Sequence, residues 1–162
     1  MNKAILKDIE KNYLEAVKFY EEEINGNSYP NINYFINLAF LYWSFAAEQN
    51  EFNNPNNIPD EWSIIGEKNF LPVIDRGLRK YPNSLELIFW RKYLSHKLYM
   101  SDFSENDCKD LLKRYRNDNN LVPYFFLYLF DKISYTEKIF ELRKICAIQP
   151  TAKNIYIKSF ID

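Results

Sequence analysis

Apolar side chains recur at spacings of three and four residues along most of this chain, the period at which an α-helix returns to the same face. The first such run extends from Ile5 to Ile24, with lysine and glutamate residues on the other side. Only three of the 162 residues are glycine, which argues against a turn-rich sheet and against a phosphate-binding glycine loop. No segment alternates long enough to demand a strand, so the sequence predicts an all-α fold.

Proline, asparagine and serine residues divide the helical pattern into about seven or eight expected helices. The first ends near Gly26 and Pro30, and the second, over 32–48, is apolar nearly all round and therefore central. A polar loop rich in asparagine and proline is expected at about 49–59. Pro72 predicts a kink or a break in the helical region that follows. Further helices are expected over 84–100, from Ser101 or Ser104 to about 116, over 122–130, from Ser134 or Thr136 to just before Gln149, and over 152–160. Residues 1–162 are expected to form a single α-helical domain.

The net charge and the first ten residues indicate which partners and which cell compartment to expect. Twenty-one basic and 22 acidic residues leave a net charge of −1, so neither a nucleic acid nor an anionic membrane is favoured as a partner. The first ten residues are interrupted by charges, unlike a secretory signal peptide, and no apolar stretch is long enough for a membrane span. Cys108 and Cys146 suggest no disulfide framework. A cytoplasmic protein is expected.

The residue types needed for chemistry do not converge in this sequence. His96 is the only histidine, and Cys108 and Cys146 lack metal-ligand spacing, so we expect no metal, no cofactor and no catalytic residue. Both thiols are interpreted as structural. Lys109 to Arg116 form a basic stripe around Tyr115, which we interpret as a solvated helix face, with RNA contact as the less favoured alternative. The chain is therefore predicted not to be an enzyme.

Two segments resemble tetratricopeptide repeats. Residues 77–90, GLRKYPNSLELIFW, resemble the junction at which a small residue and leucine close one helix and Pro-Asn begins the next, and residues 14–20 resemble the second helix of such a repeat. Similar proline or asparagine joints lie near 30, 120 and 150. The resemblance implies an irregular stack of antiparallel helix pairs, in which aromatic residues replace most of the small packing residues.

The aromatic content suggests a binding surface. Most of the 13 Tyr, 13 Phe and 3 Trp residues are expected to fill a core, but tyrosine and tryptophan also anchor protein interfaces. Residues on helices that follow a joint were selected as candidates, together with acidic residues that suit a basic partner. The predicted partner-binding residues are Tyr34, Asn37, Tyr42, Glu86, Trp90, Tyr93, Lys97, Tyr124, Glu21, Glu22, Asp60 and Glu61.

Size, composition and degenerate helical repeats make the chain similar in style to bacterial toxin-immunity proteins. This similarity implies a protein that binds a cognate toxin and covers its active site, and that is itself a monomer or a weak dimer. Two alternatives remain open at this stage. One is a tetratricopeptide-like adaptor that binds a peptide in a groove, and the other is an enzyme whose site is dispersed over several helices.

Overall fold

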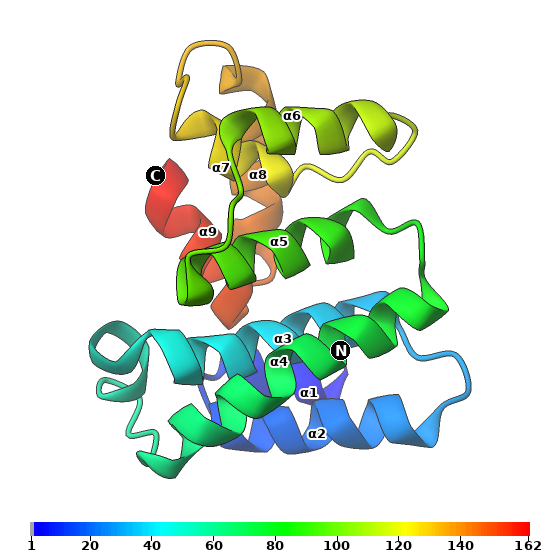
Figure 1. Cartoon of the computed structure of the whole chain (residues 1–162). Coiled ribbons are helices and arrows are strands. Elements are labelled where there is room, and N and C mark those ends of the chain that lie inside the picture. The colour runs from blue at the N-terminus through cyan, green and yellow to red at the C-terminus, as the bar shows by residue number, and fades with distance from the viewer. Residues whose placement is uncertain (1) are drawn as a thin grey trace. The chain divides into compact units, whose positions relative to one another are not determined.

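The computed structural model describes residues 2–162, and every regular element in that range is helical (Figure 1). The predicted all-α fold is confirmed, with nine α-helices and one π-helical turn in the described range. The chain divides into two compact units, Met1–Pro82 and Asn83–Asp162. That 1–162 forms a single domain stays a prediction. The boundary falls inside the segment that resembles a tetratricopeptide junction. Each unit is described by itself below.

The first unit is built around one fully covered helix. It comprises α1 (Lys3–Ile9), α2 (Tyr13–Gly26), α3 (Ile32–Ala47), a π-helical turn (Gln49–Asn53) and α4 (Glu61–Lys80). Helix α3 packs against α2 and α4, and α1 packs against α2. All eleven residues from 35 to 45 are buried. The central position predicted for this helix follows from its lack of any polar face.

Helix α4 approaches α3 closely and runs unbroken past its proline. A Cβ atom at Gly66 would overlap the carbonyl oxygen of Tyr42 and lie 3.1 Å from the Cβ of Phe45. Glycine therefore allows the two helix backbones to meet at this point. Pro72 lies on an exposed position inside α4, so the helix that was expected to kink or divide there is a single element of 20 residues.

The first predicted helix is divided in two by the backbone of Lys11. This residue adopts a left-handed conformation, with φ of 62°. Its N–H donates to Asp8 O at 3.0 Å, and the next N–H, of Asn12, donates to Lys7 O at 2.9 Å. This pair of bonds is a Schellman closure of α1. The apolar period continues across the break, so periodicity alone indicates one helix.

The polar segment predicted as a loop at 49–59 contains the π-helical turn. Asn53 is buried at its end, and its Nδ2 donates to the carbonyl oxygen of Phe45 at 2.7 Å. An asparagine side chain thus satisfies a carbonyl near the end of α3. The remaining residues to Pro59 form turns that lead into α4.

The second unit surrounds a short helix. It comprises α5 (Leu85–Tyr99), α6 (Glu105–Arg114), α7 (Pro123–Tyr128), α8 (Thr136–Ile148) and α9 (Ala152–Ile161). Helix α7 packs against α6, α8 and α9. Its phenylalanines join the rings of α5 in one aromatic core. Three hydroxyl side chains cap the helix starts as sequence preference predicts, namely Ser84, Ser104 and Thr151.

The two units differ in charge. Residues 1–82 hold eight basic and twelve acidic side chains, a net charge of −4, whereas residues 83–162 hold 13 basic and ten acidic side chains, a net charge of +3. The overall charge of −1 conceals this asymmetry. Over residues 2–162 we find no helix that combines the length and apolar character needed to cross a membrane.

Candidate functional site

Three aromatic residues that the sequence analysis placed on a binding face lie in a core. Trp90 and Tyr93 are 2% and 1% exposed, and their ring centroids lie 5.7 and 5.3 Å from that of Phe125. Tyr42 in α3 is also buried, and its hydroxyl donates to Glu21 Oε1 at 3.0 Å. Large rings contribute most when they are removed from water. These three side chains therefore serve the interior and present little surface to a partner.

Asn37, another predicted binding residue, belongs to a buried polar network in the first unit. Its Nδ2 donates to Tyr20 Oη at 3.1 Å, and that hydroxyl donates to Asp8 Oδ2 at 2.9 Å. Burial, reinforced by the neighbouring Asp8 carboxylate, raises the pKa of Tyr20, so the phenol keeps its proton. The network joins α1, α2 and α3, and its role is structural.

Glu86 forms a second buried network, in the second unit. Its Oε1 accepts hydrogen bonds from Trp90 Nε1 at 3.1 Å and from Lys153 Nζ at 2.8 Å, and its Oε2 accepts one from Asn120 Nδ2 at 2.8 Å. Burial opposes ionisation of Glu86, but the Lys153 charge and the three hydrogen bonds outweigh it and lower its pKa below the ordinary 4.5. Lys153 was missed by sequence reasoning, because it lies 67 residues from its partner and no local pattern links them.

The other selected residues remain at least partly accessible. Glu21 is held by Tyr42 and by Arg76, whose Nη1 lies 3.8 Å from Glu21 Oε2. Two tyrosines, Tyr34 and Tyr124, are half-buried, and the exposed residues are Lys97, Glu22, Asp60 and Glu61. Lys97 and Tyr124 belong to the second unit and the remainder to the first, so no single unit gathers the predicted set.

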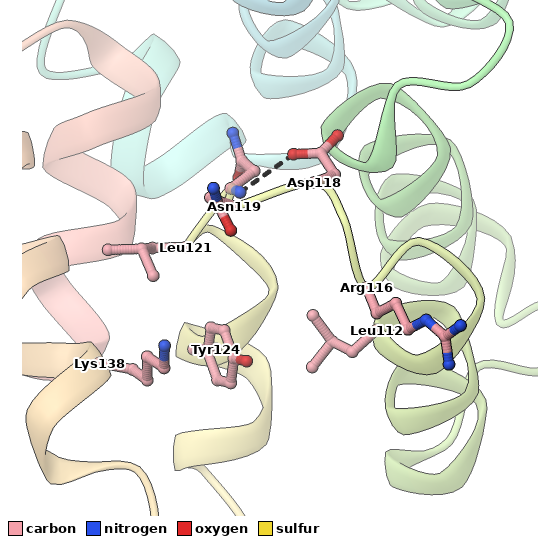
Figure 2. Close-up of a pocket in the computed structure, with 8 residues that line it drawn as sticks. Leu112, Arg116, Asp118, Asn119, Leu121, Tyr124 and Lys138 are labelled. Atoms are coloured by element: carbon pink, nitrogen blue, oxygen red, sulfur yellow. Dashed lines mark hydrogen bonds between the residues drawn. The ribbon is translucent and has the colours of Figure 1, made fainter.

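A pocket of about 390 Å³ opens in the second unit among α6, the segment 117–122, α7 and α8 (Figure 2). Its volume lies within the range of small-molecule sites, about 300–1,000 Å³. Leu112 and Leu121 provide apolar walls. In Figure 2 Lys138 extends toward the ring of Tyr124, and its Nζ lies 5.6 Å from the ring centroid. The guanidinium of Arg116 lies at the rim and points away from Tyr124.

The pocket presents positive charge that has no counter-ion. Neither Arg116 nor Lys138 forms an ion pair with any residue in the described range. The one carboxylate in the lining, Asp118, is engaged by backbone groups, since its Oδ2 accepts from Leu85 N at 3.1 Å and its Oδ1 from Asn120 N at 3.0 Å. Arg116 and Lys138 have no ion-pair partner in that range, and the Asp118 oxygens already accept backbone hydrogen bonds. The lining therefore favours a ligand with an anionic group.

A second hollow, of about 360 Å³, is more evenly charged. Lys92 and Arg114 line it together with three aspartates, of which Asp107 forms the capping box of α6 with Ser104. The hydrogen bonds from the Ser104 backbone and hydroxyl lower the pKa of Asp107. This hollow therefore carries charges of both signs and favours neither an anion nor a cation.

One face of α8 carries exposed apolar side chains. Phe140, Ile145 and Ile148 are exposed there, while Ile139, Leu142 and Cys146 on the opposite face are buried. Ile133, just before the helix, is 89% exposed, and Ile148 at its end is 81% exposed. Helix α8 thus carries apolar residues on two faces, although packing within the unit needs only one. We call Ile133, Phe140, Ile145 and Ile148 the α8 strip.

The thiols and the histidine show no sign of catalytic activation. Burial raises the pKa of Cys108 to about 12 and that of Cys146 to about 11, so both are protonated at neutral pH. His96 Nδ1 lies 2.7 Å from the carbonyl oxygen of Ser101, beside the C-terminus of α5. Within residues 2–162, no three His, Cys, Asp or Glu side chains converge as a metal site would require.

Comparison with known proteins identifies no relative of this chain. No family model matches the chain, and neither a curated protein nor a solved structure matches it. The functional proposals therefore rest on the α8 strip, the pocket and the charges of the two units.

Proposed function

We propose that this chain is a protein-binding module, and that it acts as an immunity protein which neutralises a toxin by covering the toxin's active site. The observation that carries this proposal is the α8 strip. Several large apolar side chains exposed on and beside one helix of a small protein favour an interaction site, because leaving them in water costs free energy that a partner recovers.

The side chains around the strip suit a folded partner with an apolar patch of its own. Lys144 pairs with Glu141 at 3.2 Å and lies 4.2 Å from the centroid of the Phe140 ring, so the charges crossing the strip are already compensated. Covering this surface therefore requires little desolvation of unpaired charge.

The net negative charge of the first unit favours a partner with positive charge. This unit carries a net charge of −4, and Glu22, Asp60 and Glu61 form no ion pair with other described residues. An acidic surface of this kind attracts a basic protein, such as a nuclease, over several ångströms and speeds its association. Occlusion by a preformed surface needs no catalytic group on this chain.

Genetic neutralisation, followed by reconstitution, tests the proposal. Each open reading frame beside the gene is expressed alone, and any product that stops growth is then co-expressed with this chain. We expect growth to be restored and the two purified proteins to form a stoichiometric complex. If every neighbouring product is harmless, or if rescue occurs without complex formation, the immunity function is refuted.

A matched pair of variants tests the surface. Ile148→Glu places a charge in the strip, whereas Ile64→Glu makes the same change at a 60% exposed isoleucine of the first unit. We expect Ile148→Glu to weaken the complex roughly 100-fold, because a buried unpaired charge costs several kcal/mol. Ile64→Glu is expected to bind as wild type. Equal affinities for both variants would remove the strip from the interface.

A further inference from the structure

The pocket among α6, α7 and α8 is lined by cationic and apolar side chains that have no role in the proposed binding of a protein partner. We propose that it binds a small molecule that carries a phosphate or carboxylate group attached to a compact apolar part. This inference is independent of the α8 strip, because it rests on side chains that line a concavity.

Lys138 is the anchor for the anionic group. Its ammonium has no carboxylate partner among the described residues, and its recorded contact is with the Tyr124 ring, 5.6 Å away. A ring face attracts a cation but leaves its N–H donors available. An anion in the pocket would accept these donors in charge-assisted hydrogen bonds, which are roughly twice as strong as neutral ones.

Arg116 supplies a second cation at the rim. Its guanidinium points away from Tyr124 (Figure 2), so it acts from the edge, and its long side chain has the rotatable bonds needed to turn toward a bound anion. We therefore rank Arg116 below Lys138 in its effect on affinity.

The apolar part of the ligand has its own walls. Leu112 points across the pocket toward Tyr124 in Figure 2, and Leu121 lies on the side of Lys138. A free inorganic anion would leave these walls in contact with water, whereas an anion with an attached apolar group would cover them. Both oxygens of Asp118, the one carboxylate in the lining, already accept backbone hydrogen bonds, at 3.1 and 3.0 Å.

Phenyl phosphate is the probe, with phenol and inorganic phosphate as the two partial ligands. Titration into the full chain is followed by the amide NMR shifts of residues 119–122 and of Tyr124. We expect saturable binding of phenyl phosphate at millimolar concentration or tighter, with phosphate at least about fivefold weaker and phenol without effect. Affinity should fall as salt is added, because part of the attraction is between charges near the surface.

The chain offers a matched control for Lys138. Lys132 lies over Tyr128 at 5.8 Å, in the same kind of lysine–tyrosine contact, but it does not line the pocket. We expect Lys138→Gln to weaken phenyl phosphate binding by about tenfold or more and Arg116→Gln by about two- to fivefold. Lys132→Gln should stay within about twofold of wild type.

Three outcomes overturn the proposal. The first is equal weakening by Lys132→Gln and Lys138→Gln, which would mean that phenyl phosphate follows net charge and not this pocket. The second is binding of phenol as tight as that of phenyl phosphate. The third is shifts that fail to saturate below about 10 mM, a limit weaker than millimolar affinity. Unchanged amide spectra for the three variants without ligand establish that each is folded.

Discussion

The two units differ in the polar groups that they bury and in how many large apolar side chains they expose. The first unit buries a network in which a phenol hydroxyl links Asp8 to Asn37, and among its described residues only Leu6, Tyr29 and Ile64 are large exposed hydrophobics. The second unit buries the ion pair of Glu86 and Lys153. It also leaves nine large hydrophobics exposed, namely Tyr99, Met100, Leu129, Phe130, Ile133, Phe140, Ile145, Ile148 and Ile155.

This difference shows how apolar burial is divided between the units. The first unit buries most of its apolar residues, and its helix α3 is covered on several sides. This unit also carries the net negative charge. The second unit exposes many of its apolar residues on its surface, and its interior contains the buried ion pair of Glu86 and Lys153. We therefore expect the second unit to be the more sensitive to loss of a single polar partner and the first to be the more sensitive to loss of packing space.

The largest expected effect is breakage of the buried ion pair. Lys153→Met leaves the Glu86 carboxylate buried with no counter-ion, and we expect it to lower the free energy of unfolding by about 3–5 kcal/mol. Urea denaturation followed by circular dichroism measures this change. The double variant Glu86→Leu/Lys153→Met should recover part of the loss, since both charges are removed, although Trp90 Nε1 and Asn120 Nδ2 then lose their acceptor. A single variant with less than about 1 kcal/mol of loss would contradict the importance of the pair.

The same pair predicts a dependence on pH. Because the folded pKa of Glu86 lies below its ordinary 4.5, the ionised carboxylate stabilises the folded state above that value. This contribution is lost as the pH falls from 4.5 through the lower folded pKa. Glu86→Gln should therefore show a shallower loss of stability in this range than wild type does. Identical slopes for the two proteins would contradict the lowered pKa.

The next effect concerns packing space in the first unit. Gly66→Ala forces a methyl group against the Tyr42 carbonyl, and we expect it to destabilise the protein by about 2–3 kcal/mol. Gly26 is the control, because no atom lies within 4 Å of a Cβ built there. Gly26→Ala should be neutral or stabilising by up to about 1 kcal/mol. Thermal unfolding of both variants distinguishes a tight helix contact from a general effect of glycine.

A smaller loss is expected from the polar network of the first unit. Tyr20→Phe removes the hydroxyl that donates to Asp8 and accepts from Asn37, so two buried polar groups each lose a bond. We expect a destabilisation of about 1–3 kcal/mol in urea unfolding. Combining Tyr20→Phe with Asn37→Leu should cost less than the sum of the two single changes, since the pair shares one bond. Strict additivity would show that the hydroxyl and the amide act separately.

The smallest expected effect is on thiol reactivity. Both cysteines lie in the second unit, and burial raises their pKa values to about 12 and 11, so labelling by a thiol reagent at pH 7 should be far slower than in urea. Lys153→Met should accelerate labelling more than Gly66→Ala does, because it weakens the unit that holds the thiols. Fast labelling of the wild-type protein would show that the second unit opens readily.

Several elements could be predicted because their signals are local. The all-α class followed from the period of the apolar residues, and the central position of α3 from the absence of a polar face. The start of α5 near Ser84 is also a local signal, because an N-cap needs only the side chain and the next turn of backbone. The division of the first helix at Lys11 was missed because no glycine or proline marks it and the apolar period stays in phase.

The candidate sites were less predictable. Tyr42, Trp90 and Tyr93 were expected on a surface because tyrosine and tryptophan are suited to both cores and interfaces, and composition does not distinguish these roles. The pocket combines Arg116 from the turn after α6 with Tyr124 from α7 and Lys138 from α8. Its unpaired charge becomes visible only when the nearby hydrogen bonds of Asp118 are known.

The sequence by itself determined the helical class, most helix positions and the charge of each half, because these depend on residue types and on neighbours three or four positions apart. The tertiary structure decided which aromatic rings are interior, which face of α8 remains exposed, and that Glu86 is neutralised by a lysine 67 residues away. These properties depend on contacts between distant segments. A buried charge and an exposed isoleucine acquire their free energies only from what surrounds them.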